Sequence, residues 1–205
     1  QVRKVSYRMI EGGVRQMVVD IPQIAAGEKV EALVTFEVTR SSIAAPPDPS
    51  VLKLADKIPK ELNKFLEPSP YIESKDPLIK KAAKDVFEER QPTDDWNKVE
   101  MIYDWVRAHV EYFEGPLKGA VQALKDKRGD CEELTSLFVA VCRVHKIPAR
   151  MVWVPDHCYP EFYMADDQGK GHWIPCQAAG ARAFGGIPEF RPVLQKGDNF
   201  KVPDQ

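Results

Sequence analysis

The feature that most limits how this chain can fold is an amphipathic helix that runs directly into three strand-like segments. The helix is expected to begin at Asp130, because Asp130 and Glu133 have the spacing of a capping box. Its apolar face repeats with the period of a helix and consists of Leu134, Phe138, Val141, Cys142 and His145. Past Lys146 the pattern changes to that of strands. A helix and a small antiparallel sheet are therefore expected to share one core.

The strand-like segments lie at residues 148–154, 157–164 and 171–177, with the sequences PARMVWV, HCYPEFYM and GHWIPCQ. The last two flank a turn near residues 166–171 and should pair as a hairpin. Pro160 and Pro175 lie within them. A proline cannot donate a ladder hydrogen bond, so an edge strand or a bulge is expected at each.

Helices are also expected upstream of this core. Asp76 followed by Pro77 is typical of a helix start. Thr93 is predicted to cap a second helix, and a shorter third helix is expected over residues 117–127. The order of strands, then helices, then a central helix and a sheet predicts an α+β fold.

A separate β segment is predicted at the N-terminus. Residues 14–22 and 29–38 are rich in valine and predict strands, of which the second should be half-buried. The proline-rich stretch AAPPDPS at residues 44–50 indicates a boundary. We therefore expect a small β segment over residues 1–45, interpreted as part of a β-sandwich, and a main domain over residues 46–205.

Composition and charge exclude several partners. The formal net charge is −2, so no electrostatic argument favours nucleic acid. No apolar run reaches the length of a membrane span. The chain starts at Gln1 rather than Met, which indicates a piece cut from a longer protein. The sequence is compatible with an exported and with a cytoplasmic protein, and it predicts no oligomeric state.

Cys131 follows Gly129 and Asp130, and so falls in the first turn of the central helix. The partial positive charge of a helix N-terminus favours a thiolate, and its free N–H groups can serve an oxyanion. The carboxylate of Asp130 opposes thiolate formation. A lone cysteine is more often an inert core thiol, and this interpretation applies to Cys142 on the apolar face of the same helix.

A nucleophilic thiol needs a base, and the base needs a third group that orients it. In the predicted hairpin, a register that places His157 opposite Gln177 also places Cys158 opposite Cys176. Strand alternation then puts His157 and Gln177 on one face and the two cysteines on the other. Gln177 Oε1 can accept a hydrogen bond from one imidazole nitrogen and leave the other facing Cys131.

The stretch from Gly129 to Gly180 resembles the core of the transglutaminase-like superfamily of papain-like thiol enzymes, in particular its bacterial, cysteine-protease type. The shared pattern is Gly-Asp-Cys, an apolar helix, Ile-Pro-Ala-Arg, His-x-x-x-Glu and Trp-x-Pro. With the upstream segment VEMIYDWVRAHVEY, the resemblance covers about residues 68–180. It implies an α+β fold with helices packed on a small antiparallel sheet, Cys131 as nucleophile and His157 as general base.

The chain departs from the family at the third catalytic position. After Trp-x-Pro the family usually has x-Asp, whereas this chain has Cys176 and Gln177. A neutral amide can orient an imidazole but cannot stabilise an imidazolium with a full charge. The resemblance implies a thiol-dependent amide hydrolase or acyltransferase that acts on a protein or peptide through Cys131, His157 and Gln177, without a cofactor. The absence of a dedicated amine site in the sequence favours hydrolysis. The alternative is a catalytically inactive module that binds a peptide or protein partner.

Several other residues are weaker candidates. Cys158 and Cys176 are interpreted as two buried thiols in preference to a disulfide. With His172 they lack the spacing of a metal site, so no metal is expected. Tyr112 and Trp153 are interpreted as core residues in preference to cleft residues.

The carboxylates close to His157 in the sequence are not expected to orient it. Asp156 should point to the opposite strand face, and Asp166 and Asp167 lie in the turn. Glu161 shares the face of His157 but lies about 13 Å along the strand. We therefore expect Glu161 to have a structural role.

Overall fold

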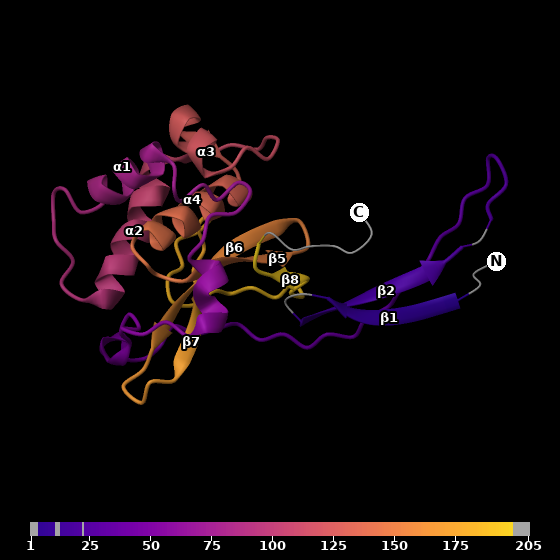
Figure 1. Ribbon diagram of the computed structural model, residues 1–205, viewed down its shortest axis with the longest axis horizontal. Coiled ribbons are helices and arrows are strands. Elements are labelled where there is room, and N and C mark those ends of the chain that lie inside the picture. The colour runs from indigo at the N-terminus through magenta and orange to yellow at the C-terminus, as the bar shows by residue number, and fades with distance from the viewer. Residues whose placement is uncertain (1–3, 11–12, 22, 199–205) are drawn as a thin grey trace. The chain divides into compact units, whose positions relative to one another are not determined.

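The computed structural model describes residues 4–10, 13–21 and 23–198, and the contacts divide the chain into two units (Figure 1). The first unit runs to Thr39 and the second begins at Arg40. This division lies a few residues before the boundary expected from the proline-rich stretch. All the residues proposed for the site belong to the second unit.

The first unit contains a β-hairpin. β1 (Lys4–Ile10) and β2 (Val14–Asp20) pair antiparallel over their whole length, which confirms the strand predicted over residues 14–22. The half-buried strand predicted over residues 29–38 is wrong. This segment forms no strand, and Leu33 and Phe36 are 87% and 80% exposed. An alternating pattern forms a strand only beside a partner that supplies a ladder, and the described residues supply none to this segment.

The second unit combines helices with a mixed set of strands. Its helices are α1 (Pro77–Asp85), α2 (Asp95–His109), α3 (Ala120–Asp126) and α4 (Cys131–Val144), with 3₁₀ turns at Pro49–Val51 and Lys60–Phe65. Its strands are β3 (Glu111–Tyr112), β4 (Arg128–Gly129), β5 (Ala149–Val154), β6 (His157–Ala165), β7 (Gly171–Pro175) and β8 (Gln195–Lys196).

Aspartates begin both α1 and α2. Asp76 Oδ1 accepts the Leu78 N–H at 2.8 Å, as the sequence predicted. The cap of α2 is Asp94 and not the predicted Thr93, because Asp94 Oδ1 accepts the Asn97 N–H at 2.7 Å. Both residue types can cap a helix, so the local sequence alone did not distinguish them.

The main sheet is antiparallel, with the strand order β7-β6-β5-β8, and α4 packs against β5 and β6 (Figure 1). The chain therefore has the predicted α+β fold. Pro175 lies on the edge strand β7 as expected, whereas β6 is an interior strand, so of the two alternatives predicted at Pro160, an edge or a bulge, the edge is wrong. The pairing of β6 with β7 ends where Glu161 lies opposite Pro175, so Pro160 falls just beyond that ladder.

The register of β6 and β7 differs from the predicted one by two residues. Because Glu161 pairs with Pro175, continuing the register places Tyr159 and not His157 opposite Gln177. A shift of two residues keeps every side chain on its original face, since the side-chain period of a strand is two. His157 and Gln177 therefore remain on one face, as diagonal neighbours.

Helix α4 is the centre of the second unit. All its residues from Glu133 to Arg143 are buried, because α1, α2 and α3 pack around it on the sides that the sheet leaves open. A helix that is apolar on most of its surface is expected in such a position. Its first turn reaches the edge of this core, where Cys131 is partly exposed.

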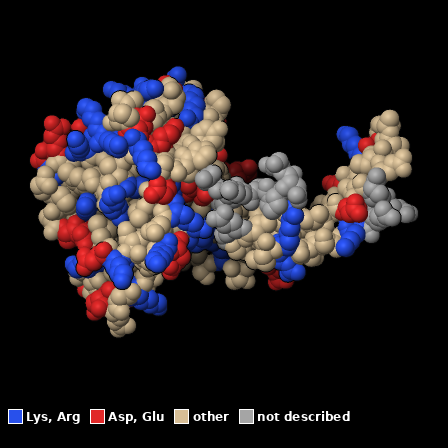
Figure 2. Space-filling model, viewed as in Figure 1, with Lys and Arg blue, Asp and Glu red and all other residues tan. Residues whose placement is uncertain are grey.

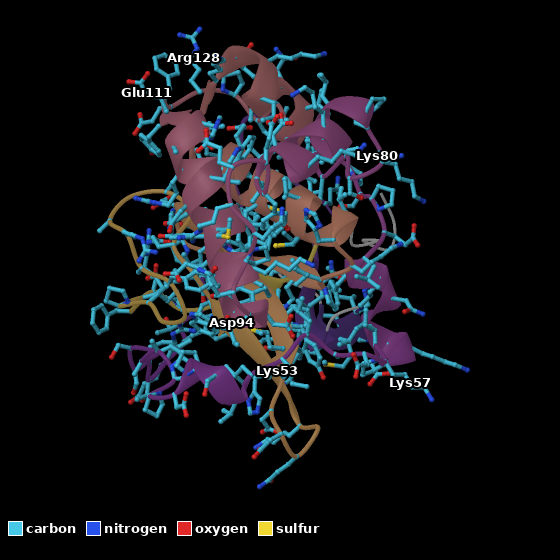
Figure 3. The ribbon with its side chains drawn as sticks, turned by 90° about the vertical axis from the view of Figure 1, so that its left-hand side faces the viewer. Lys53, Lys57, Lys80, Asp94, Glu111 and Arg128 are labelled. Carbon is cyan, nitrogen blue, oxygen red and sulfur yellow. The ribbon has the colours of Figure 1, made fainter. Side chains whose placement is uncertain are left out.

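Charged residues of both signs are interspersed over the surface that Figure 2 shows. On α1, Lys81 Nζ lies 2.5 Å from Asp85 Oδ2, one helical turn along. Figure 3 shows Glu111 and Arg128 close together at one end of the second unit, where β3 pairs with β4. This short parallel pair leads the chain into Asp130 and α4.

Candidate active site

The first turn of α4 has the predicted capping box. Asp130 Oδ1 accepts the Glu132 N–H at 2.8 Å, and Glu133 Oε2 accepts the Asp130 N–H at 3.2 Å. These bonds hold the turn in which Cys131 is the first helical residue. The cysteine thus lies where the helix dipole and unpaired N–H groups favour negative charge.

Glu133 also fastens the loop before α3 to this turn. Its Oε1 accepts the backbone N–H groups of Lys118 at 2.7 Å and of Gly119 at 3.4 Å, and the residue is only 2% exposed. Gly129 provides the space that Glu133 needs, since a Cβ at Gly129 would lie 2.4 Å from Glu133 Cβ. The glycine before Asp130 is therefore required by packing.

His157 is the first residue of β6 and follows a tight turn. Asp156 in this turn has φ of +54°, in the left-handed region. Arg191 fastens the turn, because its Nη1 donates to the Pro155 carbonyl at 3.0 Å while its Nη2 pairs with Glu189 Oε2 at 2.8 Å. The backbone that carries the imidazole is therefore held from a distant loop.

The imidazole of His157 bonds to Gln177 on one side and to Cys131 on the other. His157 Nε2 lies 3.0 Å from Gln177 Oε1. A carbonyl oxygen only accepts, so Nε2 carries a hydrogen and donates it. The hydrogen bond with the Cys131 thiol then uses Nδ1. The structure therefore brings together the three residues that the sequence singled out.

Helix α2 holds the backbone of Gln177. The Tyr103 hydroxyl donates to the Gln177 carbonyl at 2.9 Å and accepts the Ala183 N–H at 3.0 Å. Arg107 Nη1 donates to the carbonyls of Gln177 at 3.0 Å and of Ala178 at 2.9 Å. The sequence analysis singled out neither residue.

The surroundings of Cys131 stabilise its thiolate. They lower its pKa to about 4, first through a hydrogen bond from the Cys158 thiol and then through bonds from the His157 side chain and the Cys158 N–H, against the effect of burial. The hydrogen bond with Cys131 is the main cause that raises the pKa of His157. The two shifts have the directions that favour a thiolate beside an imidazolium, as in activated cysteines.

Two carboxyl groups beside Cys131, those of Asp130 and Glu132, have raised pKa values. Burial, followed by the neighbouring Glu133 and Cys131, raises the pKa of Asp130 to about 6. Burial and the charge of Asp130 raise the pKa of Glu132. The predicted opposition between Asp130 and the thiolate therefore appears as a shift of the carboxyl group, while the pKa of Cys131 stays low.

A cleft of about 360 Å³ opens over the thiol and the imidazole. It is lined by Tyr112, Glu114, Asp130, Cys131, Glu132, Trp153, Val154, Asp156 and His157.

The interpretation of Tyr112 as a core residue is wrong, since this residue is 53% exposed. Trp153 packs against the core and also lines the cleft. A larger open hollow of about 490 Å³, lined by residues between 68 and 76, contains neither a thiol nor a histidine.

The other histidine and carboxylate candidates form pairs of their own. His172 Nε2 lies 2.7 Å from Asp166 Oδ2. Glu161 pairs with Arg150 at 2.7 Å and with Lys196 at 2.8 Å, which agrees with the structural role expected for it. Asp156 lies in the turn before β6 and is one of the residues that line the cleft.

Cys158 and Cys176 are separate buried thiols, as interpreted from the sequence. The contact of Cys158 with Cys131 had no signal in the sequence. In the part of the chain that the structure describes, no group of three or more His, Cys, Asp or Glu side chains could hold a metal ion. The helices of this part include none that is long and apolar enough to cross a membrane.

The second unit has helices packed on a small antiparallel sheet, and a cysteine at a helix N-terminus faces a histidine at the start of a strand. This arrangement is that of the transglutaminase-like fold. Residues 80–178 match the model of the transglutaminase-like superfamily, so this chain contains a transglutaminase-like domain.

The comparison with solved structures gives a match that shares this fold. It is the structure of a protein from Cytophaga hutchinsonii described as "a putative cysteine protease", with 24% sequence identity and a TM-score of 0.54. The similarity covers 68% of this chain and 48% of the other, so this chain spans about half the length of that protein. No curated protein matches the sequence.

Proposed function

We propose that the chain is a thiol-dependent enzyme that hydrolyses amide bonds in proteins or peptides. Cys131 is the nucleophile, His157 the general base and acid, and Gln177 the residue that orients the imidazole. The observation that carries the proposal is the hydrogen-bonded series from the Cys131 thiol through His157 to Gln177 Oε1, at the mouth of a cleft.

In the acylation step, the Cys131 sulfur attacks the carbonyl carbon of the substrate. The Cys131 N–H belongs to the free N–H groups of the first helical turn and contributes to an oxyanion hole. His157 Nδ1–H gives its proton to the leaving amine, while Nε2–H stays bonded to Gln177 Oε1. A thioester then links the substrate acyl group to Cys131, and no cofactor is used.

Water is the acyl acceptor that the cleft favours. An amine acceptor must lose its proton before it can attack, but the carboxylates of Glu114, Glu132 and Asp156 at the cleft would stabilise an ammonium ion. Neutral water has no such penalty, and His157 can take its proton. The acidic lining thus supports hydrolysis over amine transfer.

The alternative is an inactive module that kept the fold and binds a peptide. Its support is the neutral Gln177 at the position where the family usually has an aspartate. The low pKa of Cys131 favours the enzyme, because a module that only binds has no need of a thiolate.

The rate of alkylation of Cys131 by iodoacetamide, measured against pH by peptide mass spectrometry, tests the proposal. We expect a fast reaction well below pH 7 that slows on the order of tenfold at pH 6 in His157→Ala, because part of the thiolate stabilisation is lost. The buried Cys142 and Cys176 are internal controls. A rate that rises only near the ordinary thiol pKa of about 8.5, with or without His157, would support the inactive module.

Incubation with a peptide library then separates the two acyl acceptors. New N-termini that appear with the wild-type chain and not with Cys131→Ala indicate hydrolysis. Incorporation of an added primary amine in place of cleavage would show amine transfer and contradict the preference for water.

A further inference from the structure

Cys158 lies under the first turn of α4, in direct contact with Cys131. It follows His157 in β6 and is completely buried. Cys131 packs against the core cluster to which Cys158 belongs, and the Cys158 thiol and backbone N–H both donate hydrogen bonds to Cys131. The strand therefore brings a second sulfur against the reactive one.

The remaining two cysteines are in other parts of the core. Cys142 lies about three turns further along α4, and Cys176 follows the end of β7. Both are completely buried. The thiol adjacent to the proposed nucleophile is therefore Cys158.

We propose that Cys131 and Cys158 form a reversible disulfide when the protein meets a peroxide. This disulfide blocks acyl transfer and protects Cys131 from irreversible oxidation. The inference rests on the proposed function only in that it uses the same reactive thiolate.

The chemistry takes place in two balanced steps. The Cys131 thiolate attacks one oxygen of hydrogen peroxide, the O–O bond breaks, and the departing hydroxide takes a proton to form water, leaving a sulfenic acid. The Cys158 sulfur then attacks the Cys131 sulfur, and the S–O bond breaks. The departing hydroxide takes the Cys158 proton and leaves as a second water. The two thiols lose two electrons in total, and the peroxide gains them.

Burial assigns the two roles. Cys131 is partly exposed in the cleft, so a peroxide in solution reaches it first. Cys158 is 0% exposed and is oxidised only through its neighbour. This is the arrangement of redox-sensitive pairs, in which an exposed thiolate lies beside a resolving thiol.

The charge on Cys131 sets the order of events. While Cys131 is a thiolate, its hydrogen bond with Cys158 is the main cause that raises the Cys158 pKa, and burial adds to it. Conversion of Cys131 to a neutral sulfenic acid removes that negative charge. Cys158 can then lose its proton more easily, at the point in the sequence where its sulfur has to attack.

The test is treatment of the full chain with hydrogen peroxide, followed by blocking of free thiols and peptide mapping by mass spectrometry. We expect a crosslinked peptide pair that contains Cys131 and Cys158 and has lost two hydrogen atoms. Dithiothreitol should restore at least about nine-tenths of the alkylation of Cys131, since disulfides are reversible and sulfinic acids are not.

Two variants give the matched comparison. In Cys158→Ala the same peroxide dose should convert Cys131 to the sulfinic acid, and dithiothreitol should not restore it. Cys176→Ala removes an equally buried thiol and should behave as the wild type. Because the crosslink is mapped in the wild-type chain, the test does not depend on the folding of a variant.

Two results would overturn the inference. One is a wild-type Cys131 that over-oxidises as fast as in Cys158→Ala, and the other is a crosslink to Cys142 or Cys176. If Cys131 shows fast, His157-dependent alkylation but forms no disulfide, the inference fails and the proposed function stands. If the disulfide forms while alkylation is independent of His157, the proposed function fails and the redox pair stands.

Discussion

At the scale of single residues, the proposed mechanism depends on the contact between Gln177 and the imidazole of His157. Gln177 Oε1 accepts the Nε2–H of His157 at 3.0 Å, which fixes the tautomer and points Nδ1 at the thiol. As a neutral group it adds no negative charge beside the imidazolium. The thiolate of Cys131 supplies that charge, since the hydrogen bond with Cys131 is the leading cause of the raised pKa of His157 and the bond with Gln177 comes after it.

Substitution of Gln177 should therefore change both the rate and its pH dependence. Gln177→Ala removes the bond that holds the imidazole, so we expect kcat/KM to fall on the order of 10²-fold. That bond raises the pKa of His157, so the limb at which activity falls with rising pH should move to lower pH. Gln177→Glu places a carboxylate there and should move this limb to higher pH by about one unit or more.

The measurement is the pH profile of kcat/KM for a cleaved peptide. Gln168→Ala changes an exposed glutamine in a turn and serves as the control. Profiles of the two Gln177 variants that superimpose on that of the wild type would mean that this side chain does not orient the base.

At the scale of elements, α2 acts as a support for the site although none of its residues lines the cleft. Tyr103 is completely buried, and its hydroxyl joins the Gln177 carbonyl to the Ala183 N–H. Arg107 adds two hydrogen bonds to the same loop. We expect them to act as positioning residues, which affect the imidazole only through the backbone of Gln177.

Tyr103→Phe should reduce stability and activity together. The substitution leaves the Ala183 N–H without its partner and removes one of the two side-chain donors to the Gln177 carbonyl, which costs about 1–3 kcal/mol of unfolding free energy. Chemical denaturation measures this cost, and Tyr71→Phe on an exposed tyrosine is the control. If Tyr103 acts through Gln177, its effect on kcat should largely disappear in the Gln177→Ala background. Additive effects on kcat would instead indicate a general loss of packing.

Elements were predictable from the sequence where the information is local. Helix α4 and strands β5 to β7 appear where the apolar period changes, because periodicity reports which face is buried. The register between β6 and β7 was wrong by two residues, since it depends on the turn and on packing against α4. The pairing of His157 with Gln177 was predicted nonetheless, because a two-residue shift preserves strand faces. The contact between Cys131 and Cys158 joins a helix to a strand, and no local pattern encodes it.

At the scale of the whole molecule, the buried guanidinium of Arg143 forms hydrogen bonds with segments that lie far apart in the sequence. The side chain of Arg143 in the last turn of α4 is 0% exposed. It donates to Asp198 Oδ1 at 2.6 Å, to the Glu67 carbonyl at 2.7 Å and to the Ala149 carbonyl at 2.8 Å. A buried guanidinium is tolerated only when its donors are satisfied. The segment near residue 198 is thus bound to the central helix at the end opposite to Cys131.

Asp198→Ala should separate the stability of the fold from the chemistry of the site. Removal of one partner of a buried ion pair costs about 3–5 kcal/mol, and the carbonyl partners that Arg143 keeps place the expected loss near 3 kcal/mol. Urea denaturation should show a lower midpoint with an unchanged slope, whereas Asp167→Ala at an exposed turn should match the wild type.

Cys131 lies at the other end of α4, about 20 Å away at helical rise, so its alkylation rate under native conditions should not change. A slower rate in folded Asp198→Ala would show that strain at one end of α4 reaches the other, and the thiolate would then depend on the whole helix rather than on its first turn.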